Sequence, residues 1–408
     1  MSEQIQSTKD RVILLDAMRG FALCGIIFAN LVSFTGFYSL SLSQIQALLG
    51  IDRAILFAID FFVEGKFYSI FAMLLGAGCW LQYSRFQQHQ RGFSVFWLRR
   101  MLILFVLGIS HMYLIWHGDI LTLYSLLGVC LLLFLRVENR LLMPCILALL
   151  TFPLLIHVVL AVSYTHPFWG ALNSAADSLR QWLGYQGVSL LVLRAGGGAE
   201  EVFWGNVLSA IPRAMSYLKT GRPFQVLGQF LLGVYLVRIY LQGNASIPSW
   251  RSVFSLLCLG ALLNLGYAYI KYETGSPFSV SALGLVQGVI YHLGCIVLAL
   301  GYMALFYRLW HAGAGFRNLA RMGRMALTMY LMQSILCVLL FYAYGLGLMG
   351  RVPFYSIVVF GSGILLIQFL FARFWLGRFQ FGPVEYLWRR LSYSGEPRPS
   401  TKPRSGIA

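Results

Sequence analysis

The stretch LLDAMRGFALCGIIFAN, residues 14–30, joins a hydrophobic run suited to a lipid bilayer with two ionisable side chains. Asp16 and Arg19 are three residues apart, so an α-helix would present them on one face. A charge at the bilayer centre costs about 2.5–3.5 kcal/mol on insertion scales, and such a pair therefore has a structural or a chemical role. The stretch predicts a membrane helix that carries a polar site.

The composition extends this prediction to the whole chain. Of its 408 residues, 59% are hydrophobic and only 11% are charged, against about 25% charged residues in soluble domains. We therefore expect an all-α integral membrane protein, a polytopic helical bundle. The formal charge of +17 comes mainly from short loops and the C-terminal tail, where basic residues set topology, and no nucleic-acid partner is expected.

Hydropathy predicts about ten membrane spans. They cover residues 12–37, 66–83, 95–117, 120–136, 141–163, 224–240, 253–270, 282–310, 325–344 and 354–375. With both termini in the cytoplasm, most of the 31 Lys and Arg residues lie on the cytoplasmic side, as the positive-inside rule requires. Segment 51–63 is shorter and mixed in polarity, which favours an interfacial or re-entrant position.

We predict one membrane domain over residues 1–394 and a disordered cytoplasmic tail over residues 395–408. The parts of the domain are N-terminal helices at 12–163, an extracytoplasmic loop at 164–222, C-terminal helices at 224–375 and an amphipathic surface helix at 381–393. A loop this long is often a lid or a binding element, and an insertion without function explains it nearly as well. The seven cysteines lie in apolar segments without a CxxC pair, which favours free thiols over a metal site.

The stretch GISHMYLIWHGDILTLYSLLG, residues 108–128, holds the first candidate catalytic group. A short turn joins two predicted spans here, so His111, His117 and Asp119 can converge on the outer side. A carboxylate beside an imidazole orients it and raises its basicity, as in a general base. Asp119 also suits the N-cap of the following span, and both roles remain open.

The predicted cytoplasmic face holds candidate binding residues. Asp16 and Arg19 either brace the first span as an ion pair or bind an anionic ligand. Other candidates lie in basic and amphipathic stretches: Arg99, Arg100, Arg324, Gln333 and Glu385. Such a face suits the phosphates of an acyl-CoA, and anionic lipids also suit it and are the simpler explanation.

Two further stretches predict local contacts. In FGPVEYLWRRL, residues 381–391, Glu385 and Arg389 have the i, i+4 spacing of a helical ion pair. In GKFYSIFAMLLGAG, residues 65–78, Ala72, Gly76 and Gly78 form a small-residue face, which is typical of tight helix packing in membranes.

Together these motifs resemble the YeiB family of bacterial membrane proteins. The resemblance rests on LDAMRGFALCGIIFAN, FYSIFAMLLGAG, RRMLILFVLGISHMYLIWHGDIL, GRMALTMYLMQS and FGPVEYLWRRL, in this order. Proteins of this type are grouped with transmembrane acyltransferases, namely acyltransferase-3 enzymes and the lysosomal enzyme that acetylates heparan glucosamine. The resemblance implies that cytoplasmic acyl-CoA supplies an acyl group to a sugar across the membrane.

The resemblance also implies where a catalytic histidine would stand. Acyltransferase-3 enzymes carry a D-x-x-R-G span that ends in a histidine, and the corresponding position here is Asn30. The lysosomal enzyme uses a histidine in the loop after its first span, and residues 31–49 contain none. A base must then come from elsewhere, and His111 with Asp119 is the candidate, with Asn30 as a hydrogen-bond donor to the oxyanion.

Three functions are consistent with the sequence. The first is an inner-membrane acyltransferase that uses acetyl-CoA or another acyl-CoA as a donor substrate, with no tightly bound cofactor and no metal. The second is a transporter of a small anionic metabolite, and the third is a structural membrane protein. The expected location is the bacterial inner membrane, with the lipid bilayer as partner, a glycan as acceptor and a homo-oligomer as a further expectation.

Overall fold

The computed structural model describes residues 2–37, 42–48, 50–88, 92–163, 167–241, 246–274 and 282–393, and no β-strand occurs among them. The all-α prediction is therefore confirmed for this part of the chain. The tail at 395–408, predicted to be disordered, lies outside the described residues.

The first half of the chain contains α1 (Ser2–Phe34), α2 (Leu42–Gln46), α3 (Gly50–Phe62), α4 (Lys66–Gln88), α5 (Phe93–Leu114), α6 (Leu121–Cys130) and α7 (Asn139–Ser163). The predicted long loop folds into α8 (Pro167–Trp182), α9 (Leu190–Gly196), α10 (Ala199–Leu208) and α11 (Ala210–Thr220). The remainder contains α12 (Arg222–Leu241), α13 (Trp250–Thr274), α14 (Ala282–His311), α15 (Arg317–Arg324), α16 (Ala326–Phe341), α17 (Ser356–Leu376) and α18 (Pro383–Ser392).

Each of the ten predicted spans coincides with a helix or a helix pair. Among the described residues, six helices are long and apolar enough to cross a membrane: α1, α5, α7, α13, α14 and α17. Helices α15 and α16 form a seventh span if they are taken together, and they meet at a bend of 83°. The other predicted spans, α4, α6 and α12, are helices of the same bundle that fall short in length or hydropathy.

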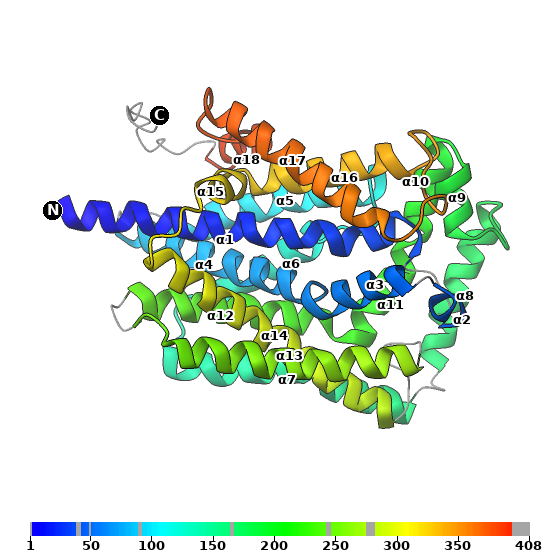
Figure 1. The fold of residues 1–408 in the computed structure, drawn as a ribbon, viewed down its shortest axis with the longest axis horizontal. Coiled ribbons are helices and arrows are strands. Elements are labelled where there is room, and N and C mark those ends of the chain that lie inside the picture. The colour runs from blue at the N-terminus through cyan, green and yellow to red at the C-terminus, as the bar shows by residue number, and fades with distance from the viewer. Residues whose placement is uncertain are drawn as a thin grey trace.

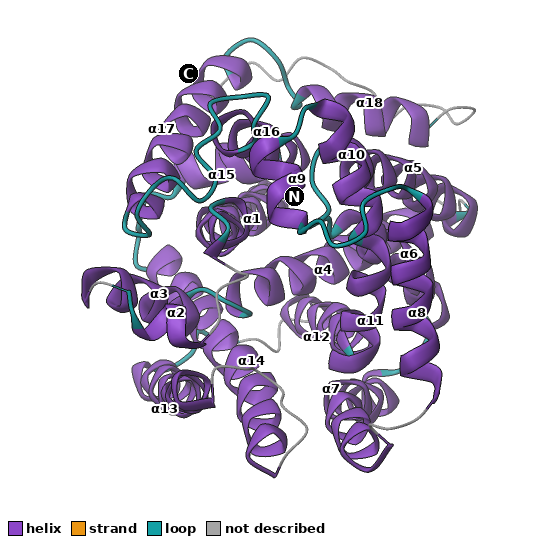
Figure 2. Cartoon of the chain, turned by 90° about the vertical axis from the view of Figure 1, so that its right-hand side faces the viewer, coloured by secondary structure: helices purple, strands orange, loops and turns teal. Residues whose placement is uncertain are grey.

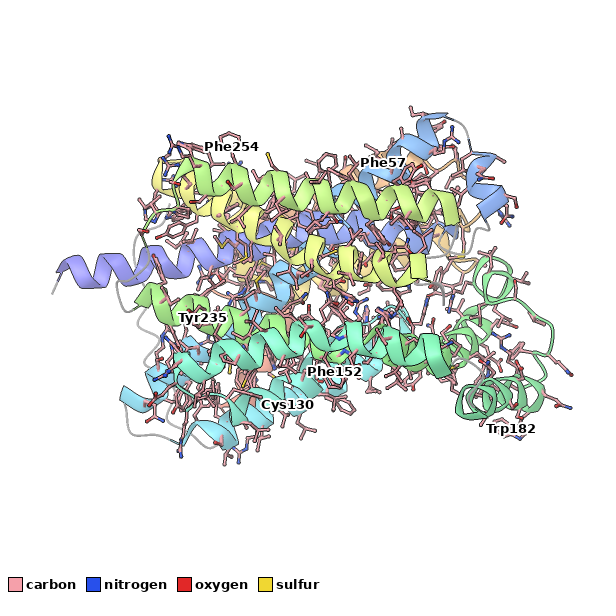
Figure 3. All side chains as sticks on the ribbon, turned by 90° about the horizontal axis from the view of Figure 1, so that it is seen from below. Phe57, Cys130, Phe152, Trp182, Tyr235 and Phe254 are labelled. Carbon is pink, nitrogen blue, oxygen red and sulfur yellow. The ribbon has the colours of Figure 1, made fainter. Side chains whose placement is uncertain are left out.

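The long helices run side by side along the longest axis of the molecule (Figure 1). The N-terminal part of α1 lies at one end of the bundle, together with α15 and α18. We call this end the amino-terminal end. Helices α8, α9 and α10 lie at the opposite end, which we call the far end (Figures 1 and 2). Large hydrophobic side chains stay exposed along the bundle, among them Phe152 on α7 and Phe254 on α13, both labelled in Figure 3. Their exposure suits contact with lipid.

Close helix crossings hold the centre together. A Cβ atom on Gly76 of α4 would overlap the carbonyl of Phe230 on α12, and one on Gly233 of α12 would overlap the carbonyl of Met73 on α4. The packing role predicted for the small-residue face is thus confirmed at Gly76. Small residues let the two backbones approach, which is how helices associate in lipid.

A close helix crossing at glycine residues also joins α1 to the bent span formed by α15 and α16. A Cβ atom on Gly323 of α15 would overlap the carbonyl of Asp16, and one on Gly20 of α1 would overlap the carbonyl of Leu319. This contact positions the polar residues of α1 beside the break between α15 and α16.

Candidate functional site

A buried histidine–carboxylate pair lies between α5 and α6. The Nδ1 atom of His111, in the last turn of α5, is 3.0 Å from Oδ1 of Asp119. His111 is 1% exposed and Asp119 is 2% exposed. The Nε2 atom of His111 is buried and has no hydrogen-bond partner within the described part of the chain. An oriented imidazole with one unengaged nitrogen has the arrangement of a general base.

Asp119 also has a structural role. Its second oxygen, Oδ2, accepts a 2.7 Å hydrogen bond from the backbone N–H of Thr122 in the first turn of α6. The carboxylate therefore contacts the first turn of α6 and the imidazole of His111 at the same time.

Segments distant in sequence also contact this pair or the residues beside it. The ring of Tyr330 on α16 is 5.2 Å from the ring of His111, and its hydroxyl accepts a 3.3 Å hydrogen bond from the backbone N–H of Ile120. From α11, Arg213 and Tyr217 donate hydrogen bonds of 2.8 and 3.3 Å to the carbonyl of Asp119. The predicted outer loop thus supplies residues that contact the site.

A second polar site lies toward the amino-terminal end. Nη1 of Arg19 is 2.6 Å from Oδ1 of Asp16, which confirms that the predicted pair is in contact. On α5, Arg100 lies close enough to Arg19 and to Arg389 for mutual repulsion. Arg389 in turn lies near Arg85 and Arg324. We call Arg19, Arg85, Arg100, Arg324 and Arg389 the arginine cluster.

Aromatic rings from the C-terminal stretch support this cluster. The guanidinium of Arg100 lies 3.5 Å from the ring centroid of Trp388, whose Nε1 donates a 2.9 Å hydrogen bond to the Arg100 carbonyl. The guanidinium of Arg389 lies 4.2 Å from the ring centroid of Phe381. These contacts hold arginine side chains through their faces and leave the edges of the guanidinium groups, which bind oxyanions, for a ligand.

Glu385 caps the second half of the bent span. Its carboxylate accepts hydrogen bonds of 2.9 and 2.5 Å from the backbone N–H and the hydroxyl of Thr328, at the start of α16. The predicted ion pair of Glu385 with Arg389 is wrong: no such pair occurs among the described residues, because the free N-terminus of α16 attracts the carboxylate instead. Burial raises the pKa of the Glu385 carboxyl, and the hydrogen bonds from Thr328 oppose that rise.

Removal of this cap is expected to destabilise the protein. Glu385→Ala leaves the buried N–H of Thr328 without an acceptor, which costs about 1–3 kcal/mol. The measurement is thermal unfolding in detergent micelles. Glu200→Ala, at an exposed position in the first turn of α10, is the matched control and should shift stability by less than about 0.5 kcal/mol. Equal unfolding temperatures for the two variants would contradict the capping role.

Helix α16 connects the two polar sites. Thr328, bonded to Glu385, and Tyr330, beside His111, are two residues apart in one helix. Two residues correspond to a rise of about 3 Å. The Glu385 cap therefore lies within about one helical turn of Tyr330 along α16, whereas Arg100 of the arginine cluster is about 16 Å from His111 along α5.

Three of the remaining predicted site residues lie apart from both groups. Asn30 is half-buried in α1 and makes no hydrogen bond to the described residues. Gln333 is buried, and its Nε2 donates to the Leu23 carbonyl and to Oε1 of Gln368, at 3.2 and 3.0 Å. Arg99 faces away from Arg100 and lines an apolar groove of about 440 Å³ between α5 and α6.

Sequence reasoning missed a buried charge cluster between α3, α4 and α13. Nζ of Lys271 lies 2.8 Å from Oδ1 of Asp60 and 3.5 Å from Oε2 of Glu64. Nζ of Lys66, which is fully buried, donates a 2.6 Å hydrogen bond to the Asp60 carbonyl. Lys271 follows Asp60 by 211 residues, so no local pattern signals this contact. The charges balance within the cluster.

No group of three His, Cys, Asp or Glu side chains suited to a metal ion occurs among the described residues. His117 lies in the connection between α5 and α6, where its ring is 5.9 Å from that of Trp116, and it does not complete such a group. What the arrangement can do chemically is remove or supply a proton at His111 and bind anionic groups at arginines.

The bundle, the bent span and the buried polar sites define a polytopic α-helical membrane protein. The chain is similar to uncharacterized protein YeiB of Escherichia coli (strain K12), at 30% identity over 402 residues, which covers 94% of this chain and 96% of the relative. It is similar to uncharacterized protein YxaH of Bacillus subtilis (strain 168), at 26% identity over 403 residues and 95% of each chain. Residues 234–395 match the family described as "Protein of unknown function (DUF418)". No solved structure matches the chain. The chain belongs to the YeiB family.

Proposed function

We propose that this protein is an inner-membrane acyltransferase that moves an acyl group from cytoplasmic acyl-CoA to a hydroxyl or amine of an extracytoplasmic sugar. The observation that carries the proposal is the buried His111–Asp119 pair, whose Nε2 atom is unengaged within the described residues. A donor bound at Arg100 would extend along α5 toward His111, which lies about 16 Å away along the helix axis.

In the proposed reaction, Nε2 of His111 removes the proton of the acceptor hydroxyl. The acceptor oxygen then attacks the thioester carbonyl, the carbon–sulfur bond breaks, and the CoA thiolate takes the proton back from His111. Asp119 holds the imidazole in the correct tautomer and stabilises its cationic form. Arg19, Arg100 and Arg389 would hold donor phosphates.

The donor half of the proposal is tested by calorimetric titration of purified protein with acetyl-CoA in detergent. Arg100→Gln and Arg389→Gln each remove a charge-assisted contact worth about 1.5–3 kcal/mol, so each should weaken binding about tenfold or more. Arg390→Gln is the matched control, because Arg390 is the exposed neighbour of Arg389 and lies outside the arginine cluster. Its affinity should equal that of the unmodified protein.

Absence of acetyl-CoA binding by folded protein would overturn the acyl-transfer proposal. Equal weakening by all three substitutions would also count against it, because general charge at the membrane surface would then explain the effect.

One observation favours transport as a second candidate. The bend of 83° between α15 and α16 interrupts this span, as in transporters whose interrupted helices bind substrate. Uptake of an anionic metabolite into proteoliposomes, without acetyl-CoA, would support this candidate. Transport of this kind does not require His111 to act as a base.

A further inference from the structure

Two arginines near the C-terminal end of the predicted outer loop lie beside the same aromatic ring. The guanidinium of Arg213 on α11 lies 5.0 Å from the ring centroid of Tyr217, and that of Arg222, the first residue of α12, lies 5.8 Å from the same centroid. Both side chains are half-buried. Two positive charges in one partly desolvated region are unfavourable unless an anion compensates them.

The chain itself does not provide that anion among the described residues. Neither arginine forms an ion pair there. Asp119, the nearest acid in the hydrogen-bond network, offers Arg213 only its backbone carbonyl, because its carboxylate bonds to His111 and Thr122. The carboxylate of Asp60 is bonded to Lys271.

The side chain of Arg222 packs against aromatic rings and forms no hydrogen bond to the described residues. Its guanidinium lies 4.4 Å from the ring centroid of Tyr68 on α4. The hydroxyls of Tyr68 and Tyr291 are 3.1 Å apart, and the hydroxyl of Tyr124 donates a 3.0 Å hydrogen bond to the Tyr68 carbonyl. The rings of Tyr68 on α4 and Tyr217 on α11 therefore hold the face of this guanidinium, and its donors have no acceptor among the described residues.

We infer that Arg213 and Arg222, which both lie beside the ring of Tyr217, bind an oxyanion (a phosphate or a carboxylate) on the sugar acceptor. This inference rests on the proposed function and names its substrate class: the acceptor is an anionic sugar, held by its charge. Arginine suits this role because its fork of donors matches both oxyanions. Tyr217 and Arg213 also bond to the Asp119 carbonyl, so the bound acceptor would lie beside the His111–Asp119 pair.

The test is equilibrium dialysis of the full chain in detergent against radiolabelled glucose 1-phosphate, glucuronate and uncharged glucose. We expect at least one charged sugar to bind ten or more times as tightly as glucose, and the tighter of the two identifies the oxyanion. Arg213→Gln and Arg222→Gln should each weaken that binding at least tenfold, whereas Arg222→Lys should keep part of it. Arg351→Gln, an exposed arginine on the connection between α16 and α17, should leave it unchanged.

Equal binding of glucose and the charged sugars, or unchanged binding by both glutamine variants, would overturn the inference. The comparison among sugars uses the unmodified protein and stays decisive if a variant fails to fold. Titration of the same preparations with acetyl-CoA separates the two proposals. Donor binding without charged-sugar binding defeats only the anionic acceptor, and charged-sugar binding without donor binding defeats only acyl transfer.

Discussion

His111→Ala is expected to reduce acyl transfer by about a hundred- to ten-thousand-fold, the usual contribution of a positioned general base. The readout is transfer of radiolabel from acetyl-CoA to glycan in inside-out membrane vesicles that contain the protein. Acetyl-CoA affinity should stay unchanged, because the proposed donor site in the arginine cluster uses different residues. The exposed His311, at the end of α14, gives the matched control His311→Ala, which should retain full transfer.

Asp119→Asn separates the two roles of the carboxylate. Asparagine caps helices about as well as aspartate, so the hydrogen bond to Thr122 and the unfolding temperature should persist. Transfer should still fall, because an amide does not stabilise the imidazolium form of His111. Full activity in this variant would show that Asp119 serves only as the cap of α6, and full activity in His111→Ala would remove the proposed base.

Gly233→Val is expected to have the largest effect on folding. Its Cβ would overlap the Met73 carbonyl, an atom of a helix backbone that cannot move away alone. Overpacking of a core costs about 1–3 kcal/mol, and a clash with backbone lies at the upper end. We expect a large loss of folded protein, measured by size-exclusion chromatography and thermal unfolding in detergent.

Gly363→Ala and Gly233→Ala form the matched comparison. Gly363 of α17 has open space around its Cβ position, so alanine there should be neutral or should stabilise the helix by about 0.5–1 kcal/mol. Gly233→Ala should destabilise despite the same gain in helix propensity. Equal stability of the two variants would show that α4 and α12 separate at little cost.

Much of the candidate site follows from local sequence. The turn between His111 and Asp119 is short enough for the side chains to converge, although their contact depends on how the two spans are rotated, which the sequence leaves open. The spacing of Asp16 and Arg19 places them on one helix face. The predicted ion pair of Glu385 with Arg389 is wrong because the i, i+4 spacing takes no account of a partner elsewhere in the chain. That partner, Thr328 at the start of α16, lies 57 residues away.

By itself, the sequence determined the all-helical membrane fold, the positions of the long helices and the polar residues within them. These properties depend on hydropathy and on residues within a turn or two of one another, and both are local. Only the tertiary structure decided which side chains meet: Tyr330 with His111, Arg213 with Asp119, and Lys271 with Asp60. Such contacts depend on how each helix is rotated and where a span breaks, and those are settled by close packing between helices that are far apart in the chain.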